Sequence, residues 1–473
     1  MTFADAEVDA ESADRLTAQG LRLGLVDTAD RAAFSAWLYA DARGFYQPHT
    51  APKQLDALLA TTAYRRTTGV WDGTEADAAT PVATVSSWPA PLTLPGENDI
   101  SAWAISSVTV APTHRRRGIA RALLEAELRT ARAAGIPAAI LTASEATIYS
   151  RYGFGAATRA AQLTIDTRRA RWAGPNASGR VRFRTLEQLR VEGRPVFERA
   201  RRRQPGEIAV DDALWADLLG IMGDGEDEVK HLRAVRYDDA AGDIQGFAVY
   251  RVGGGEEDFS RHTVTVRYLC AATDDAYSGL WHYLVDLDLV TSVVAPLRSV
   301  DEPVIWQLSD TRAVRTSGLS DQLWLRILDV KTVLEARSYS APAQLVLDIA
   351  DPFGYANGRV LLAVGSDGRA GVTPLDSTPP VTTAPDSTAS GSSVPGSSVP
   401  ASSADAATGL ALTDLEVCGL ALTIADLGSL CLGGASSRTL VRAGRISELA
   451  PGSADAFDTA FRSPVAPALS FWF

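Results

Sequence analysis

Residues 108–121 read VTVAPTHRRRGIAR, and this stretch decides the fold of the first part of the chain. It ends a segment, 102–110, that mixes polar and apolar residues as a half-buried strand does, and it opens a segment, 119–133, with leucines at helical spacing. A turn between strand and helix presents unpaired backbone N–H groups and the positive end of the helix dipole to an anion. Three arginines add charge, and Gly118 lets the backbone approach the anion closely. The alternative, a solvated basic run that caps a surface helix, explains the charge but not the preceding strand.

Further elements around this turn complete an alternating pattern. Residues 82–87 are typical of a strand, and Gly135 followed by Pro137 stops the helix. A short, almost fully apolar strand then spans 138–142, and a second helical stretch ends at Gly153. Strand, helix, strand and helix in this order predict an α/β sandwich with parallel pairing.

Two motifs in this region resemble those of the GNAT-type N-acetyltransferases. The coenzyme A signature of these enzymes is an Arg-x-x-Gly-x-Gly/Ala turn, which Arg115, Gly118 and Ala120 match. Residues 149–154, YSRYGF, resemble their Tyr-x-x-x-Gly-Phe element, in which the first tyrosine sits beside the thioester sulfur. The two motifs are separated by one helix and one strand, in the order that these enzymes show.

The chain is still more similar to the enhanced intracellular survival family, bacterial enzymes that acetylate several amines of aminoglycosides and lysine side chains. The Val-x-Val-Ala-Pro-Thr-His-Arg-Arg-Arg-Gly run of that family stands here at 108–118, and its Thr-Ala-Ser-Glu segment before Ile-Tyr stands at 142–145 and 148–149. The resemblance implies tandem GNAT folds, the first active and the second degenerate, followed by a sterol-carrier-like α/β domain. It also implies a homohexamer.

The resemblance further implies the residues of the site, with acetyl-coenzyme A as acetyl donor and no metal. The edge of the strand would hold the pantetheine arm and the acetyl carbonyl, and the turn would cradle the pyrophosphate. The cofactor-binding residues carried over by position are Val108, Thr109, Val110, Arg116, Arg117, Gly118, Ile119, Ala120, Arg121, Ser144 and Glu145, and the catalytic residues are Tyr149 and Phe473.

Tyr149 is expected to protonate the departing thiolate. A phenol with a pKa of about 10 can donate to a thiolate whose conjugate acid has a pKa of about 8.5, without ionising beforehand. The alternative for Tyr149 is an aromatic side chain packed on an amphipathic helix.

In the family that the chain resembles, the general base is the carboxylate of the last residue, here Phe473. Three of the last four residues are aromatic, which fits a docked terminus better than a solvated tail. Since a terminal carboxylate is a weak base in water, either burial raises its pKa or it orients the ammonium and passes the proton through water. Trp472 stands where an acidic residue is expected, which puts a preference for aminoglycosides in doubt.

The length of the chain and its turn-forming residues indicate three units. We expect the active unit at 1–167, the degenerate unit at 168–320 and the sterol-carrier-like unit at 321–473. In the last unit, Asn357-Gly358 and Asp367-Gly368 predict hairpins of an antiparallel sheet, and 423–430 and 453–461 predict helices. Residues 374–408 are rich in Pro, Ser, Thr and Ala and lack Lys and Arg, a composition that predicts a disordered insertion.

The second unit repeats the order of strand and helix without the chemistry. Strands at 246–252 and 263–269 flank three glycines, 253–255, which predict a hairpin turn rather than a phosphate loop. The helix that follows begins with Asp274 and Asp275, where the first unit carries arginines. Because carboxylates would repel a pyrophosphate, we expect this unit to bind no cofactor.

Composition narrows the class of protein. The 473 residues are 46% apolar and 22% charged, which is typical of a globular protein with sizeable cores. The net charge of −12 argues against nucleic acid as the main partner. The acidic N-terminus and the lack of a long apolar run predict no membrane partner and a cytoplasmic protein, and the three scattered cysteines predict reduced thiols.

Two hypotheses from different classes remain. The first is an N-acetyltransferase that acts on primary amines of small cationic, aminoglycoside-like molecules or on lysine side chains. The second is a carrier or binding protein whose C-terminal sheet holds a lipid-like ligand while the first unit senses acetyl-coenzyme A. The retained Tyr149 and the aromatic chain end favour the enzyme. Trp37, Phe45 and Tyr46 could wall the acceptor pocket, although we expect them to pack in the core.

Overall fold

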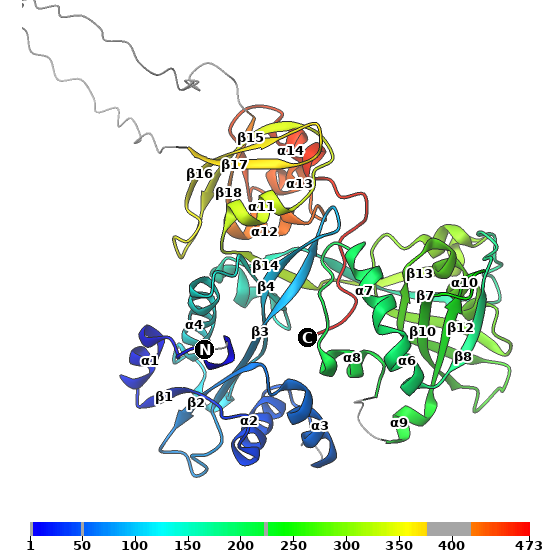
Figure 1. Ribbon diagram of the computed structural model, residues 1–473, viewed down its shortest axis with the longest axis horizontal. Helices are drawn as coiled ribbons and strands as arrows, with labels where there is room; N and C mark the ends of the chain where they lie inside the picture. Colours follow the sequence, from blue (N-terminus) through cyan, green and yellow to red (C-terminus); the bar gives the residue numbers. More distant parts are fainter. Residues whose placement is uncertain (1–2, 49–51, 222–225, 376–417) are drawn as a thin grey trace, which may run out of the picture.

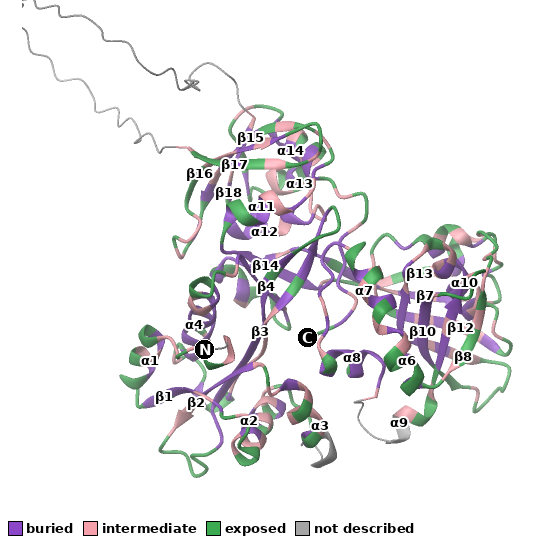
Figure 2. Cartoon of the chain, in the orientation of Figure 1, coloured by how far each residue is buried: buried purple, intermediate pink, exposed green. Residues whose placement is uncertain are grey.

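The computed structural model describes residues 3–48, 52–221, 226–375 and 418–473, and within these ranges it contains three β-sheets of seven, seven and five strands (Figure 1). Buried residues line the strands of each sheet, while the outer helices alternate buried and exposed residues (Figure 2). One apolar cluster continues from the first sheet into the second and third units. The three units therefore share part of their core.

The first sheet is mixed. Its strand order is β1-β2-β3-β4-β5-β14-β6, and only β4 and β5 run parallel to each other. The strands are β1 (Leu21–Leu25), β2 (Arg66–Asp72), β3 (Ala83–Leu94), β4 (Asn98–Val110), β5 (Ala138–Thr142), β6 (Gly155–Ala156) and β14 (Leu323–Ile327).

Strands β3 and β4 form a hairpin that is longer than the sequence pattern predicts. The expected strands 82–87 and 102–110 cover only part of them. Pro89 and Pro91 break the local signal, but they pair with Trp103 and Ser101 in the hairpin, because cross-strand packing outweighs local propensity.

Helices cover both faces of this sheet. The apolar side of α4 packs with α1 on one face, while Phe34 and Trp37 of α2 pack with α3 on the other. The predicted helix 119–133 is confirmed to the residue, but the stretch expected to run to Gly153 is only the short α5 followed by a 3-10 turn. The helices are α1 (Ala10–Thr17), α2 (Arg31–Gly44), α3 (Pro52–Thr62), α4 (Ile119–Ala133) and α5 (Ala146–Tyr149), with 3-10 turns at Phe3–Asp5, Pro112–His114 and Ser150–Tyr152.

The second sheet has the order β13-β7-β12-β11-β10-β9-β8, with β11 and β12 parallel. The predicted hairpin is present, but Gly253 and Gly254 pair with Thr263 and His262 as part of the strands. The turn therefore spans 255–261, and of the three glycines only Gly255 lies in it. The strands are β7 (Arg159–Asp166), β8 (Arg180–Arg184), β9 (Leu232–Asp238), β10 (Ile244–Gly254), β11 (His262–Ala271), β12 (Val290–Arg298) and β13 (Val314–Asp321), and the helices are α6 (Leu186–Glu192), α7 (Arg194–Arg202), α8 (Asp212–Leu218), α9 (Glu226–His231) and α10 (Asp274–Val285), with 3-10 turns at Pro303–Gln307 and Thr311–Ala313.

Two strands cross the expected unit boundaries at 167 and 320. Strand β7, from the end of the first segment, pairs with β12 and β13 of the second sheet. Strand β14, from the start of the third segment, pairs with β5 and β6 of the first sheet. The boundaries stay a prediction for the units, but the hydrogen-bonded sheets exchange strands across them.

The third sheet has the order β17-β16-β15-β18-β19. The expectation of a purely antiparallel sheet is wrong, because β15 and β18 are parallel. Pro374 and Leu375, the first residues of the expected disordered insertion, belong to β17, and 376–408 lie outside the described residues. The strands are β15 (Ala343–Ala350), β16 (Gly358–Val364), β17 (Ala370–Leu375), β18 (Gly419–Thr423) and β19 (Ser447–Glu448), and the helices are α11 (Val330–Ala336), α12 (Ile424–Cys431), α13 (Ser437–Arg442) and α14 (Ser453–Phe461).

After α14 the chain leaves the third unit and ends between the first and second units (Figure 1). This C-terminal tail, residues 462–473, is held by polar contacts. The side chain of Gln204 donates to the carbonyl of Ala466 at 2.8 Å, and Gln322 donates to the carbonyl of Phe471 at 2.9 Å. The chain end is thereby fixed against the first sheet.

Candidate active site

The two parallel strands of the first sheet separate toward their carboxyl ends. Strands β4 and β5 pair only from Ala102 to Ala104 and from Ala138 to Ile140. Beyond these pairs β4 continues to Val110, with a bulge at Ser107, whose φ is +56°. A gap therefore opens between 105–110 on one side and the end of β5 on the other, and the backbone of Val108, Thr109 and Val110 borders it.

The turn before α4 is shaped to receive an anion. Gly118 is the N-cap residue, with φ +75°, and no side chain caps the helix. Arg116 also has a positive φ, of 63°, and both Arg115 and Arg116 are exposed. A Cβ built on Gly118 would meet no atom within 4 Å, so the space in front of the helix is open. The first backbone N–H groups of α4, at Ile119, Ala120 and Arg121, thus fit a pyrophosphate.

The buried side chain of His114 stabilises this turn. His114 Nε2 lies 3.2 Å from Asp72 Oδ2, and the guanidinium of Arg117 lies 3.6 Å from the same oxygen. Hydrogen bonds from Thr74, and then from His114, hold the pKa of the Asp72 carboxyl below its usual range. Arg117 and Arg121, which pairs with Glu125, have protein partners. Among the predicted cofactor-binding arginines of the turn, exposed Arg116 has the side chain with the fewest protein contacts.

The other predicted cofactor residues lie across the gap. Ser144 and Glu145 are exposed between β5 and α5, and Glu145 occupies the N-cap position of α5. They follow the end of β5, whereas Val108–Val110 end β4. The structure thus brings the predicted cofactor residues to the two rims of one opening.

Tyr149 ends α5 and is 6% exposed. Its ring packs edge-on against Phe154 at 6.3 Å and tilted against Trp324 at 6.4 Å between centroids. Its hydroxyl makes no hydrogen bond within the described part of the chain. Burial, and to a smaller extent Glu145, raise the pKa of Tyr149. The phenol therefore stays protonated at neutral pH, as an acid must.

The terminal carboxylate of Phe473 lies at the end of β5. Thr142 Oγ1 donates to it at 3.0 Å, and the ring of Phe473 packs edge-on against Trp88 at 5.8 Å. Phe471 is buried, whereas Trp472 is 49% exposed. The chain end thus reaches the same strand that precedes the motif of Tyr149.

Phe473 and Tyr149 belong to opposite faces of the first sheet. Phe473 and Trp88 pack in the cluster that joins the three units, whereas Tyr149 packs with Trp324 in the cluster under α4. Between these two faces, β4 and β5 lose their pairing after Ala104 and Ile140. A carboxylate on one side and a phenol on the other can therefore serve two groups that meet in the gap.

The sequence did not predict one carboxyl that lies on the same face of the first sheet as Phe473. Asp41 lies on α2, and its Oδ1 is buried without a hydrogen-bond partner. Burial raises the pKa of Asp41 to about 7, and the Ser107 hydroxyl offsets this in part. The only sequence signal is an acidic residue one helical turn after Trp37. Trp37 does pack in the core, but the same expectation is wrong for Phe45 and Tyr46, which are 41% and 83% exposed.

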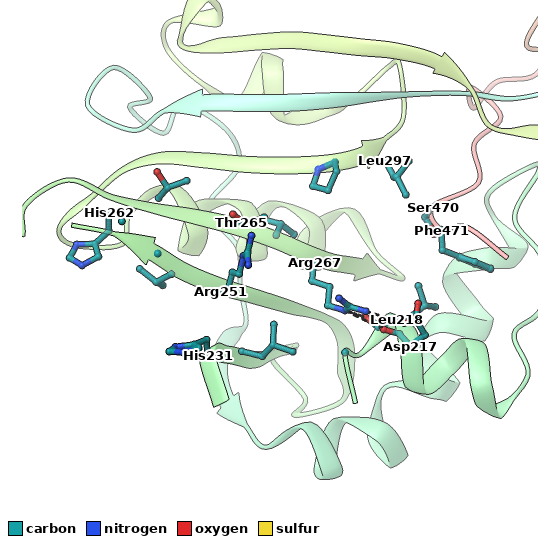
Figure 3. Close-up of a pocket in the computed structure, with 18 of the residues that line it drawn as sticks. Asp217, Leu218, His231, Arg251, His262, Thr265, Arg267, Leu297, Ser470 and Phe471 are labelled. Carbon is teal, nitrogen blue, oxygen red and sulfur yellow. Dashed lines mark hydrogen bonds and ion pairs between the residues drawn. The ribbon is translucent and has the colours of Figure 1, made fainter. Parts of the chain in front are cut away.

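A cavity of about 1050 Å³ adjoins the chain end in the second unit. Ser470 and Phe471 lie at one end of it and His262 at the other (Figure 3). Arg251 and Glu256 both line it, so its charged groups are of both signs. Trp472 also lines this cavity and precedes the terminal residue.

No metal cluster or membrane span emerges from the described ranges. There, no three His, Cys, Asp or Glu side chains are grouped to hold a metal ion. In the same ranges, no helix combines the length and apolar character needed to cross a bilayer.

Comparison with known proteins identifies the family. Models of the acetyltransferase (GNAT) domain match residues 26–157 and 206–327, and a sterol carrier protein domain matches 401–470. An N-acetyltransferase Eis of Mycobacterium tuberculosis is 36% identical over 294 residues, which cover 60% of this chain and 69% of the relative. The chain belongs to the Eis family of N-acetyltransferases. The predicted family and the predicted tandem GNAT and sterol-carrier architecture are confirmed.

Other relatives of this Eis family member span nearly its whole length. An uncharacterized N-acetyltransferase of Streptomyces avermitilis is 34% identical over 440 residues, covering 91% of this chain and 94% of its own. The crystal structure of Eis1 from Mycobacterium abscessus superposes with a TM-score of 0.74 at 26% identity, over 96% of this chain and 100% of that one. The Eis-type chain described here is therefore an acetyltransferase, and its fold implies acetyl-coenzyme A as donor.

The second GNAT domain of this Eis family member differs at the helix that corresponds to α4. Thr273 caps α10, accepting a hydrogen bond from Ala276 N at 3.2 Å, and Asp274 and Asp275 occupy its first turn. In the first domain the corresponding helix starts at uncapped Gly118. The contrast supports the expectation that the second domain binds no cofactor, which stays a prediction.

Proposed function

We propose that this enzyme transfers the acetyl group of acetyl-coenzyme A directly to a primary amine of a small cationic, aminoglycoside-like molecule or of a lysine side chain. The observation that carries the proposal is the placement of the Phe473 carboxylate and the Tyr149 phenol on opposite faces of one sheet, at the gap between β4 and β5. Direct transfer needs one group that positions and deprotonates the amine and another that protonates the leaving thiolate. The two groups lie on opposite sides of the gap.

The chain offers a complete cradle for the donor. The N-terminal amides of α4 and the exposed Arg116 would hold the pyrophosphate, with Ser144 and Glu145 along the opposite rim. The backbone of Val108–Val110 would hold the pantetheine arm and the acetyl oxygen, on which negative charge builds during attack. When bound, acetyl-coenzyme A supplies an acetyl group activated as a thioester.

Tyr149 and Phe473 would divide the proton transfers. Tyr149 donates its hydroxyl proton to the sulfur as it leaves, because its pKa is raised and the proton is present at neutral pH. The Phe473 carboxylate, held by Thr142, orients the amine by charge and hydrogen bonding and takes up its proton through water. Neither role requires a metal ion.

We infer the class of acceptor from the anionic chain end and from the family, and not from the cavity of about 1050 Å³. Acidic and basic side chains both line that cavity, so its charge favours no class of acceptor. The relatives carry no stated acceptor in their names, so the aminoglycoside-like and lysine acceptors stay a proposal. We further propose a homohexamer in the cytoplasm, which light scattering of the purified enzyme and cell fractionation would test.

A thiol-release assay with mass readout tests the proposed function. The full chain is incubated with acetyl-coenzyme A and, separately, with spermidine, an aminoglycoside, a lysine-containing peptide and a thiol-free buffer blank. We expect thiol release together with a mass gain of acetyl groups on at least one amine. Thiol release no faster than in the blank for every amine would overturn the proposal and favour the carrier hypothesis, in which the sterol-carrier-like domain binds a lipid.

A further inference from the structure

The two parallel strands of the second sheet also separate toward their carboxyl ends. Strands β11 and β12 pair only as far as Thr265 and Val294. A cavity of about 370 Å³ lies at the opening beyond these pairs, and it is lined by the ends of both strands, the start of α10 and tail residues between Pro464 and Ser470. In the order of elements, this opening corresponds to the gap between β4 and β5 of the first sheet.

The C-terminal tail is bound at this opening by hydrogen bonds. Ser470 Oγ donates to Glu207 Oε2 at 2.7 Å and lies 3.0 Å from the hydroxyl of Tyr268 on β11. Two residues earlier, Ala468 N donates to the carbonyl of Pro205 at 2.9 Å. The pair of Ser470 and Glu207, the tail anchor, therefore docks the tail on the second sheet just before the chain ends.

The tail anchor is also tied to the first sheet. Glu207 is 4% exposed, and its backbone carbonyl accepts a hydrogen bond of 2.9 Å from Thr93 N on β3. On the same strand, Trp88 packs against the ring of Phe473. The side chain of Glu207 thus holds Ser470 at a fixed place relative to the strand that the last residue contacts.

The three residues after the tail anchor cross the ends of two neighbouring strands. The carbonyl of Phe471 accepts from Gln322, which precedes β14, and the carboxylate of Phe473 accepts from Thr142, which ends β5. Leu323, the residue after Gln322, pairs with Thr142 in the sheet. A displacement of the tail anchor would therefore be passed along a short, extended segment to the carboxylate.

We propose that Ser470 and Glu207 position the Phe473 carboxylate for the transfer, so that the second GNAT domain serves to hold the chain end of the first domain's active site. This inference rests on the proposed function. A segment that is bound only at Thr142 could swing about that contact, whereas binding at the tail anchor as well restricts the carboxylate to one place. The tail anchor touches neither the donor nor the amine, so its role is to position.

The test measures kcat with the best amine of the panel, in the full chain and in the chain that lacks Phe473. Ser470→Ala removes both hydroxyl contacts and leaves the last three residues intact. In the full chain we expect kcat to fall about tenfold, with KM for acetyl-coenzyme A within about threefold, because a small misplacement of a reacting group is costly. Without Phe473 the carboxylate is already displaced, so the same substitution should change kcat by less than about twofold.

Two further variants make the comparison sharp. Ser463→Ala is the matched control, since the hydroxyl of Ser463 bonds only within the tail, to the carbonyl of Val465 at 2.6 Å, and this variant should keep the wild-type kcat. Tyr268→Phe keeps the ring and removes the hydroxyl that contacts Ser470. It should lower kcat about threefold in the full chain and have no effect without Phe473, and it decides if Ser470→Ala does not fold.

Equal losses of kcat in the full and the shortened chain would show that the tail anchor acts through the stability of the fold, and would refute its positioning role. A wild-type kcat in folded Ser470→Ala refutes that role as well, while leaving the proposed function standing. Full turnover in the chain that lacks Phe473 would remove the role of the terminal carboxylate, and the positioning role with it.

Discussion

The hydroxyl of Thr142 donates a hydrogen bond of 3.0 Å to the terminal carboxylate of Phe473, 331 positions later in the chain. Thr142 is the last residue of β5, beyond the point where β4 and β5 stop pairing. A chain terminus is usually poorly ordered in solution, yet here it is tied to the end of a central strand. The last residue is therefore held in a fixed position at the proposed active site.

Extending the C-terminus should abolish most of the activity. A short tag converts the carboxylate of Phe473 into an amide and pushes residues toward the amine side of the gap. We expect turnover to fall about 10²-fold or more, with acetyl-coenzyme A affinity within about threefold. Folding should survive, because Leu469 and Phe471 keep their place in the core.

Removing Phe473 alone gives the matched comparison. This variant keeps a terminal carboxylate but moves it back by one residue, to half-exposed Trp472. Turnover equal to that of the untagged enzyme in both the tagged and the shortened chain would return Phe473 to a packing role. Steady-state kinetics on all three chains make the decision.

Tyr149→Phe removes the proton donor and little else. The hydroxyl has no hydrogen-bond partner in the described part of the chain, so its loss leaves no unsatisfied group. We expect the melting temperature to change by less than about 2 °C and turnover to fall about 10²-fold, with acetyl-coenzyme A affinity nearly unchanged. The reverse pattern, weakened affinity at normal turnover, would make Tyr149 a binding residue.

Gly118→Ala should weaken the binding of acetyl-coenzyme A more than it lowers the stability of the fold. At φ +75° an alanine is strained by about 1 kcal/mol, and its Cβ points into the open space in front of α4. We expect KM for acetyl-coenzyme A to rise about tenfold at nearly constant kcat, because the methyl group keeps the pyrophosphate from the backbone.

Gly135→Ala is the control for that experiment. Gly135 lies at the other end of α4, also has a positive φ of 70°, and also has nothing within 4 Å of a built Cβ. It should lose a similar amount of stability and keep the wild-type KM. An equal rise of KM in the two variants would trace the effect to the helix rather than to the anion site.

Glu207→Gln should change how stability depends on pH. Glu207 accepts from Ser470 Oγ at 2.7 Å and anchors the C-terminal tail, and burial raises its pKa to about 7. Because the folded state then binds a proton more tightly than the unfolded chain, stability falls as pH rises from about 4.3 to about 7. Gln cannot ionise and does not share this loss.

Relative to the wild type, Glu207→Gln should therefore gain stability between pH 5 and pH 8, on the order of 3 kcal/mol if the full shift is expressed. Thermal unfolding of both proteins at the two pH values measures it. A difference between the proteins that is the same at pH 5 and pH 8 would mean that Glu207 is not the titrating group. Tyr268, 3.0 Å from Ser470, is kept in both proteins.

The sequence was sufficient to predict those elements whose residue pattern lies within one continuous segment. Leucine spacing and the Gly135 stop predicted α4 to the residue, and the apolar run predicted β5. The strand, the basic turn and the helix start are adjacent in the chain, so the uncapped helix start at Gly118 could be predicted without any tertiary contact. Local signal failed at β3, where Pro89 and Pro91 hide a strand that only its partner stabilises.

Contacts between segments that are distant in the sequence decided the features that no single segment encodes. The sequence by itself determined the donor turn, the tyrosine of α5 and an aromatic chain end. Only the tertiary structure decided that β14 returns to the first sheet, that Phe473 meets Thr142, and that the Asp41 carboxyl lies near Ser107 with one oxygen buried. The physical reason is that an isolated Asp on a helix has no periodic signature. Its pKa depends on desolvation by strands that are distant in sequence and become its neighbours only when the sheet forms.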